Sequence, residues 1–354
     1  MSKLEQLQAA LQLHDTDAII ITNAQNRRYL TGFTGSAGTV IVTKTRALLL
    51  VDFRYTQQAT NQCDTFEVLE IDRNHLYETI QEILEQELIQ TVGFEQHHVT
   101  YFSYQLMKSK LTAILKPMPT IVEDLRMIKT PEEIEIIKKA AWISDEAFNH
   151  ILTFIKPGIS ELDIAYELES HMRKNGATGA AFDMIIASGH RSALPHGVAS
   201  SKIVEQGDML TMDFGAYYRG YRSDMTRTIA VGEPLEQLKE VYHIVHGALQ
   251  HALSNMKAGI TGQEADRYSR DYITAKGYGQ NYGHGAGHGI GLDIHENIFM
   301  STICKDMLEE NMVLTVEPGI YIPNVGGVRI EDDVIVTKEG VEVITHSPKE
   351  LIIL

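Results

Sequence analysis

Four acidic side chains lie in segments whose other residues are typical of buried β-strands. They are Asp213, Asp224, Glu317 and Glu331, and Val, Met, Ile and Phe surround them in the chain. Burying a carboxylate among such residues is unfavourable unless it is paired with a cation or binds a metal. For any one of these acids, a position on an edge strand or in an ion pair is an equally good interpretation. The four together predict a site at which carboxylates bind metal.

The glycine-rich stretch 281–297 supplies a different kind of side chain. It holds His284, His288 and His295 among five closely spaced glycines. Each glycine costs about 1 kcal/mol relative to alanine in a helix, so these histidines are not a zinc-binding pair on one helical face. Glycine also lets the backbone approach another group closely. The stretch is therefore either a turn with surface histidines or a loop that brings a histidine to a metal, a phosphate or a substrate.

Four carboxylates and one histidine form a ligand set suited to two divalent ions. Bridging carboxylates hold such ions about 3.5–4 Å apart. An oxygen-rich set favours Mn²⁺ over a structural zinc site, in which cysteine and histidine dominate. The two cysteines, Cys63 and Cys304, belong to none of these motifs. We therefore predict two divalent metal ions. Mn²⁺ is the preferred ion, with Co²⁺ or Zn²⁺ as alternatives.

The helices that must position these residues occur in pairs. Thr130 and Glu133 form a capping box at the start of one helix, which stops at Lys156-Pro-Gly158. Ser160 caps a second helix, which ends near Gly176.

The same order of features recurs later in the chain. A helix start at 235–239, a helix stop and cap at 257–261 and a second helix end at Gly277 repeat those of the first pair. We therefore predict that residues 130–354 are a duplicated helix–helix–strand unit, and sites commonly form between such halves.

Antiparallel strands are predicted to follow each helix pair, and each half places its two acids on either side of a turn. In the first half the turn lies near Tyr218, so Asp213 and Asp224 are expected about opposite one another. The strands are expected at 183–188, 209–216, 223–231, 312–321, 328–337 and 341–344. The fold class of this domain is α+β, with helices segregated onto a curved antiparallel sheet.

The first third of the chain has a different organisation. Helical and strand-like segments alternate in it, which indicates an α/β domain with a mixed sheet. Residues 26–38 are expected to form loop and turns, because glycines punctuate them. Helices are expected at 4–13, 53–62, 74–90 and 100–115, and strands at 17–22, 39–43, 46–52, 66–71, 91–95 and 120–123. The domains are thus predicted at 1–124 and 132–354, joined by a linker at 125–131.

The charge and composition of the chain disfavour several classes of partner. The 354-residue chain has a formal net charge of −16 at pH 7, which disfavours a nucleic acid or an anionic membrane as the main partner. No apolar run is long enough to span a membrane, and the first residues lack a signal-peptide pattern. The cysteines have no paired spacing, which suits a reducing compartment. We expect a cytoplasmic enzyme or binding protein.

Taken together, these motifs resemble those of the pita-bread metallopeptidases, which include aminopeptidase P, prolidase and methionine aminopeptidase. Residues 26–38 resemble the amino-terminal domain of the Xaa-Pro aminopeptidases. The proline-specific branch is similar in Leu194-Pro-His-Gly197, Gly287-His-Gly-Ile-Gly-Leu292 and Gly326-Gly-Val-Arg-Ile-Glu-Asp332. The resemblance covers essentially the whole chain. It implies a creatinase-type first domain followed by a pita-bread catalytic domain.

The resemblance also implies which residues bind the metals. The five ligands would be Asp213, Asp224, His288, Glu317 and Glu331. Asp213 would bind one ion, His288 and Glu317 would bind the other, and the remaining two acids would bridge both.

Further residues receive catalytic roles from the same resemblance. Glu317 would carry the proton of the attacking water. His196 and His295 would bind the substrate and stabilise the tetrahedral intermediate, and Arg329 would orient the substrate. His284 has no firm role.

The implied activity is hydrolysis of the Xaa-Pro bond at the N-terminus of peptides, as in aminopeptidase P, by a hydroxide that bridges two metals. Prolidase, which cleaves Xaa-Pro dipeptides, is the alternative. A metal-free hydrolase like creatinase, or a binding module of the same fold, is a remote alternative because all five ligand positions are filled. The partners implied are peptides with proline at the second position, and the resemblance suggests a homodimer or a larger homo-oligomer.

Overall fold

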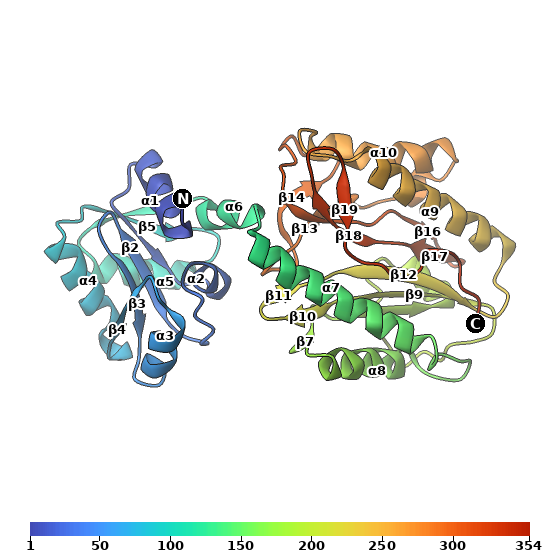
Figure 1. Cartoon of the computed structure of the whole chain (residues 1–354), viewed down its shortest axis with the longest axis horizontal. Coiled ribbons are helices and arrows are strands. Elements are labelled where there is room, and N and C mark those ends of the chain that lie inside the picture. Colours follow the sequence, from blue (N-terminus) through green and yellow to red (C-terminus); the bar gives the residue numbers. More distant parts are fainter. The chain divides into compact units, whose positions relative to one another are not determined.

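The computed structural model describes all 354 residues, which form two compact units, Met1–Arg126 (unit 1) and Met127–Leu354 (unit 2) (Figure 1). Unit 1 has one sheet and one apolar core, whereas unit 2 has four sheets and two apolar cores. None of the helices combines the length and the apolar character that crossing a membrane requires. All the candidate site residues belong to unit 2.

Unit 1 contains the strands β1 (Ala18–Ile21), β2 (Thr39–Thr43), β3 (Ala47–Val51), β4 (Glu67–Glu70), β5 (Thr91–Glu95) and β6 (Ile114–Met118). Its helices are α1 (Lys3–Leu13), α2 (Ala24–Thr31), α3 (Thr56–Gln62), the 3₁₀ turn η1 (Arg73–His75), α4 (Leu76–Gln86), α5 (Tyr101–Lys110) and α6 (Ile121–Met127). The strands form one sheet in the order β4-β3-β2-β1-β5-β6. β1, β2 and β3 pair antiparallel, whereas β4, β5 and β6 join in parallel, which confirms the predicted mixed sheet.

The loop expected at 26–38 is wrong in its first part, because Ala24–Thr31 form α2. Asn23 caps this helix by accepting hydrogen bonds from two main-chain N–H groups of the first turn, and Gly32 ends it with φ of 73°. An apolar stripe does not reveal the helix, since its buried residues include Arg27. The guanidinium of that arginine donates hydrogen bonds to main-chain carbonyls of the loop that follows.

The strand expected at 120–123 is also wrong. Ile121–Met127 form α6, and the last strand, β6, comes earlier, where it begins in the last two residues expected to be helical and runs on to Met118. β6 lies at the edge of the sheet, where Pro117 can stand without removing a ladder hydrogen bond. Its proline and its half-exposed side chains make β6 a poor match to the pattern of a buried strand.

Unit 2 has four long helices, α7 (Pro131–Ile151), α8 (Glu161–Lys174), α9 (Glu236–Asn255) and α10 (Gly262–Ala275). Capping boxes begin three of them, at Thr130, Ser160 and Thr261. Because Ser160 and Thr261 each cap the second helix of a pair, the helices have the duplicated arrangement that the sequence predicts. Figure 1 shows the four helices flanking the strands of this unit.

The first half of unit 2 contributes the strands β7 (Gly179–Ala180), β8 (Ile185–Ser188), β9 (Asp208–Phe214), β10 (Ala216–Tyr218), β11 (Tyr221–Arg222) and β12 (Met225–Val231) and the 3₁₀ turn η2 (Gly189–Ala193). The second half contributes η3 (Gly279–Asn281), β13 (Gly287–Gly289), β14 (Glu296–Met300), β15 (Val313–Val316), β16 (Gly319–Ile322), β17 (Gly326–Arg329), β18 (Asp332–Val336) and β19 (Val341–Val343). They form the sheets β12-β9-β8, β11-β10-β7, β14-β13-β15-β18-β19 and β16-β17. Neighbouring strands in these sheets pair antiparallel, as expected.

Three of the predicted strands, at 209–216, 312–321 and 328–337, are each divided in two. Two of the interruptions fall on acids, because Glu317 follows β15 and Glu331 separates β17 from β18. A residue that leaves the ladder at such a point is free to aim its side chain away from the sheet. The breaks therefore help to place carboxylates in a site rather than in a regular ladder.

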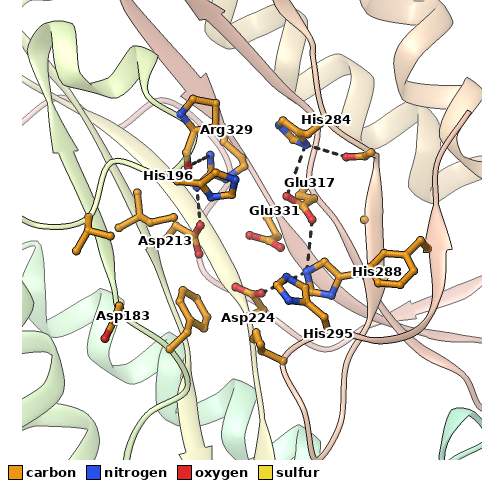
Figure 2. A pocket seen from close by; sticks show the side chains of 18 residues that line it. Asp183, His196, Asp213, Asp224, His284, His288, His295, Glu317, Arg329 and Glu331 are labelled. Carbon is orange, nitrogen blue, oxygen red and sulfur yellow. Dashed lines mark hydrogen bonds and ion pairs between the residues drawn. The ribbon is translucent and has the colours of Figure 1, made fainter. Parts of the chain in front are cut away.

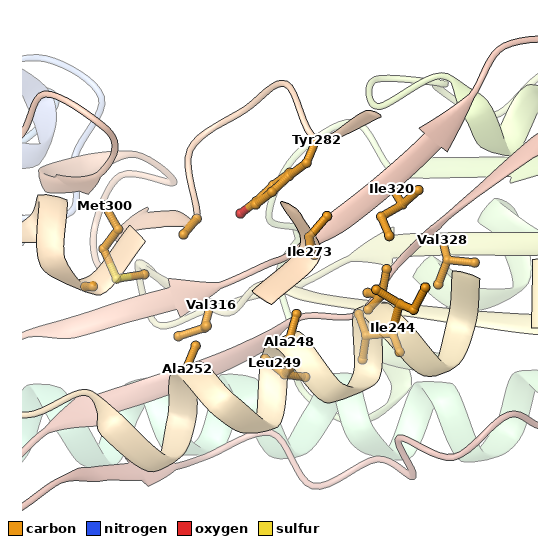
Figure 3. Packing of buried hydrophobic residues seen from close by; sticks show 14 of the residues in the cluster. Ile244, Ala248, Leu249, Ala252, Ile273, Tyr282, Met300, Val316, Ile320 and Val328 are labelled. Carbon is orange, nitrogen blue, oxygen red and sulfur yellow. The ribbon is translucent and has the colours of Figure 1, made fainter. Parts of the chain in front are cut away.

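Each half of unit 2 has its own core. The side chains of α7 and α8 pack with β8, β9 and β12, and those of α9 and α10 pack with β15 to β18. Figure 3 shows Ala248 and Leu249 of α9 in the second of these cores, near Val316 and Ile320. Burying a leucine, valine or isoleucine side chain contributes about 1.5–3 kcal/mol to the stability of the fold. The two cores hold the strands that carry the acids in fixed positions.

Candidate metal centre

One cavity of about 390 Å³ in unit 2 collects the residues singled out from the sequence (Figure 2). Its lining includes His196, Asp213, Asp224, His284, His288, His295, Glu317, Arg329 and Glu331. His288 is buried in the wall, whereas His196 and His295 are exposed to the cavity and solvent. The structure also adds Phe182 and Asp183, which carry no motif signal in the sequence.

The first two acids belong to the first half, Asp213 on β9 and Asp224 directly before the neighbouring strand β12. Asp213 on β9 pairs with Thr226 on β12, so the expectation that it lies opposite Asp224 is wrong. The ladder continues without a bulge, which places Asp224 opposite Gly215 and therefore diagonal to Asp213 on the same face. A side chain at Gly215 would collide with the main-chain oxygen of Ser223, which lies only 1.7 Å from the place of a Cβ.

The other two acids face each other in the second half. The β15–β18 pairing on one side and the β16–β17 pairing on the other put Glu317 opposite Glu331. Glu331 is also tied to the first half. Its main-chain N–H donates to the carbonyl of Thr226 at 3.0 Å, and the Thr226 hydroxyl donates to Glu331 Oε2 at 2.5 Å. Thr226 thus links the two halves at the centre of the site, although a threonine on a buried strand carries no signal in the sequence.

His288 points its ring between the acids. Its Nε2 lies 3.8 Å from Asp224 Oδ2 and 3.6 Å from Glu317 Oε1. Nδ1 lies 3.0 Å from the carbonyl oxygen of Gly289, so Nδ1 carries the proton and Nε2 presents its lone pair to the acids. A Cβ at Gly287 would lie 2.0 Å from the Thr315 oxygen, so only glycine allows the close approach that aims His288 inward.

A hydrogen-bonded chain gives His284 a place in the structure. Arg329 donates from Nη2 to Asp213 Oδ2 at 2.5 Å and from Nη1 to the Tyr321 hydroxyl at 2.8 Å. The same hydroxyl lies 2.8 Å from Nε2 of His284, whose Nδ1 lies 2.8 Å from the Gly285 oxygen. Because Nδ1 faces a carbonyl, Nε2 accepts the hydroxyl proton. Tyr321 was missed in the sequence because a tyrosine on a buried strand is ordinary by pattern.

Burial and mutual repulsion disfavour charge on the acids. Burial first, and then the charges of Glu331 and Asp213, raise the pKa of Asp224 well above its usual range. Burial also raises the pKa of Glu331 well above its usual range, with further contributions from Glu317 and Asp213. Burial lowers the pKa of His288, which keeps the ring neutral and able to act as a ligand.

The donor set fits a metal. Ligand atoms of Asp224, His288 and Glu331 all lie within 4.8 Å of one another. Oδ1 of Asp213 and Oδ1 of Asp224 are buried without a hydrogen-bond partner. A buried carboxylate oxygen with no donor is unfavourable, and a cation at this place would compensate it.

Comparison with known proteins agrees with this geometry. Residues 135–338 match the model of metallopeptidase family M24, and residues 3–128 match the creatinase/prolidase N-terminal domain. The chain is 52% identical over 353 residues to the uncharacterized peptidase YqhT of Bacillus subtilis, which covers 99% of this chain and 100% of the relative. It is 40% identical over 352 residues to a Xaa-Pro dipeptidase of Pyrococcus furiosus, with 99% of each chain covered.

Solved structures show the same similarity along the whole chain. The Xaa-Pro dipeptidase from Bacillus anthracis matches with a TM-score of 0.98 and 53% identity, over 99% of each chain. The X-Pro aminopeptidase from Thermotoga maritima matches with a TM-score of 0.91 and 40% identity, over 100% of each chain. This chain therefore belongs to metallopeptidase family M24 and carries the creatinase/prolidase N-terminal domain in front of its catalytic domain.

Proposed function

We propose that this protein is a metallopeptidase that hydrolyses Xaa-Pro bonds with two divalent metal ions, of which Mn²⁺ is the preferred one. The convergence of four carboxylates and one imidazole on one cavity supports this proposal. The residues that would hold the ions are Asp213, Asp224, His288, Glu317 and Glu331. Ions bound there supply Lewis-acid polarisation of a carbonyl and lower the pKa of water.

Glu317 is the residue that moves the proton in this proposal. Burial raises the pKa of Glu317, so its carboxylate is a better base than an exposed glutamate. It accepts a proton from the attacking water and returns it to the proline nitrogen as the bond breaks. The leaving nitrogen of any peptide bond must gain a proton, and the nitrogen of an Xaa-Pro bond also has no N–H by which an enzyme could orient it.

In this proposal, two exposed histidines bind the scissile carbonyl. His196 and His295 line the same cavity. Burial, and next the charge of His288, lower the pKa of His295, which keeps that ring neutral near pH 7. A neutral imidazole N–H can donate to the carbonyl oxygen as it gains negative charge. Arg329 holds Asp213 by a 2.5 Å ion pair and so fixes one carboxylate.

The relatives favour dipeptides as the first substrate class. Proteins named Xaa-Pro dipeptidase are 38% and 40% identical to this chain, and one solved Xaa-Pro dipeptidase is 53% identical. Cleavage of longer peptides, as expected from the resemblance to aminopeptidase P, is the second candidate. The 40% identical structure named X-Pro aminopeptidase supports it.

The test uses the protein loaded with Mn²⁺ and three peptides that begin with the same residue: Xaa-Pro, Xaa-Pro-Yaa and Xaa-Ala. Cleavage of Xaa-Pro with little action on Xaa-Ala is the expected result, and the Xaa-Pro-Yaa rate decides between the two candidates. No cleavage of either proline peptide would overturn the proposal.

A further inference from the structure

The segment from Tyr282 to Glu296 carries three histidines of the cavity but has little structure of its own. It contains five glycines, and its only regular parts are the three-residue strand β13 and Glu296, with which β14 begins. A glycine-rich segment has many accessible backbone conformations, so other groups must hold it in one of them. Two ion pairs, one partly buried and one fully buried, contact its main chain on either side of His288.

The first ion pair comes from α10. Arg270 donates to both carboxylate oxygens of Asp266, at 2.6 and 2.8 Å, and Asp266 is fully buried. The same guanidinium donates to the carbonyl oxygens of Tyr282 and His284, at 3.1 and 2.6 Å. Asp266 Oδ1 accepts the N–H of Ala286 at 3.1 Å. The pair therefore fixes three main-chain groups just before His288.

This first contact extends to a proposed metal ligand. The carbonyl of Ala286 accepts the main-chain N–H of Glu317 at 2.8 Å. Asp266 holds the N–H of the same residue, so a shift of Ala286 moves the backbone from which the Glu317 carboxylate extends.

The second ion pair holds the segment after His288. Lys129 Nζ lies 3.1 Å from Glu296 Oε2, and the two side chains are 1% and 4% exposed. Glu296 Oε1 accepts the N–H groups of Leu292 and Asp293, at 2.9 and 3.2 Å. A Cβ at Gly291 would lie 2.7 Å from the Glu296 carboxylate, so the glycine makes room for that group. Lys129 itself is anchored just before α7, where its N–H donates to the carbonyl of Asn311.

Stability alone is a weak reason for such pairs. Replacing a buried ion pair by apolar residues of similar volume is often neutral or stabilising, because desolvating two charges is costly. Here the charged side chains form hydrogen bonds with main-chain groups of a segment that has little regular structure. His295, next to Glu296, packs its ring at 4.4 Å from that of His288 in an edge-to-face contact.

We propose that Asp266–Arg270 and Lys129–Glu296 are positioning pairs with separate tasks. The pair on α10 sets the metal affinity through Ala286 and Glu317. The Lys129–Glu296 pair sets the place of His295, and with it the binding of substrate. This inference rests on the proposed function, because it assigns the two tasks to that site.

The test replaces each pair by apolar residues and measures Mn²⁺ affinity, KM, kcat and melting temperature. Asp266→Leu with Arg270→Met is expected to weaken Mn²⁺ binding by about 10–100-fold, as is usual when partners of metal ligands are lost. Lys129→Met with Glu296→Leu is expected to raise KM about tenfold while Mn²⁺ affinity changes less than about threefold.

A conservative variant and a matched control separate positioning from stability. Lys129→Met with Glu296→Gln keeps an oxygen that accepts the Leu292 N–H, so it should restore KM to within about threefold of wild type. Lys202 and Asp208 form a 2.8 Å ion pair in the other half of the unit. Lys202→Met with Asp208→Leu should change the melting temperature only.

The opposite results would overturn the inference. These are wild-type Mn²⁺ affinity and KM in the folded apolar variants, or losses that follow melting temperature equally in all three pairs. If an apolar pair does not fold, Asp266→Glu and Glu296→Asp displace the same carboxylates by one methylene, and unchanged constants in them would be equally decisive. Mn²⁺ binding is measured without substrate, so a failure to cleave Xaa-Pro peptides would count against the proposed function and leave this measurement intact.

Discussion

Asp224 and Glu331 are the two acids whose charges are most strongly disfavoured in the site. Burial is the largest cause for both, and neighbouring carboxylates add to it. The raised pKa values favour the protonated acids unless a cation lies beside them. A divalent ion removes the conflict and converts an electrostatic cost into binding energy. Protons and metal ions therefore compete for the carboxylate oxygens of these two residues.

That competition predicts how metal binding depends on pH. The raised pKa values of Asp224 and Glu331 mean that protons are displaced when metal binds, and a proton on His288 would oppose metal in the same direction. Mn²⁺ affinity should therefore fall as pH falls from 7.5 to 5.5, by about tenfold per pH unit for each proton displaced. Calorimetric titration at several pH values in buffers of different ionisation enthalpy measures both quantities. Affinity that does not change with pH would contradict the assignment.

Glu317 is predicted to matter more for turnover than for folding. Glu317→Gln preserves the size of the side chain and removes the base, so kcat for an Xaa-Pro peptide should fall by about 10²–10⁴-fold. The melting temperature of the metal-free protein should stay within a few degrees of wild type, because the change removes a charge that burial disfavours. Wild-type turnover in this variant would show that another group moves the proton.

At the scale of elements, the site depends on contacts between strands of the two halves. Arg227 on β12 is one of the largest fully buried side chains. Its guanidinium donates to the carbonyl of Glu331 and, at 2.8 Å, to Asp332. It also donates at 2.9 Å to the carbonyl of Ser347, in the segment after β19. One side chain thus joins β12, β18 and the last residues of the chain.

Arg227→Met is therefore predicted to destabilise unit 2. Removing one member of a buried ion pair typically costs about 3–5 kcal/mol. The low end is expected here, because Lys349 Nζ lies 3.2 Å from the other oxygen of Asp332 and still compensates its charge. Adding Asp332→Asn should recover part of the loss. Denaturant unfolding followed by circular dichroism measures the change, and a loss below about 1 kcal/mol would contradict the role given to the pair.

Some elements could be predicted from sequence because local chemistry defines them. The capping boxes at Thr130 and Ser160 and the helix ends near Gly176 and Gly277 are written in short motifs, and the structure has helices with these limits. α2 was missed because its buried residues include Asn26 and Arg27, whose side chains hydrogen-bond groups outside the helix. β6 was missed because an edge strand with a proline has no alternating pattern.

The site likewise has some residues that could be predicted from the sequence and others that could not. The acids are visible in the sequence because a carboxylate on a buried strand is unusual, and all four lie in one cavity. The diagonal placement of Asp213 and Asp224 was not predicted, since it depends on where the hairpin register begins. Thr226, Tyr321 and the two positioning pairs act through main-chain or hydroxyl contacts. Such contacts leave no pattern in residue type or spacing.

At the scale of the whole molecule, unit 2 uses duplication to build a site that neither half contains. Asp213 and Asp224, on or next to strands, belong to one half, and Glu317 and Glu331, between strands, belong to the other. Each half buries its own apolar core against its own pair of helices. The glycine-rich segment then adds His288, which completes the proposed ligand set.

Metal stoichiometry measured together with activity tests the central claim most directly. The protein is stripped with chelator and titrated with Mn²⁺, while bound metal and Xaa-Pro cleavage are followed in the same samples. Two high-affinity ions per chain, no cleavage in the stripped protein and recovery of cleavage as the site fills are the predicted results. Full Xaa-Pro cleavage by metal-free protein, or saturation without any cleavage, would contradict the account.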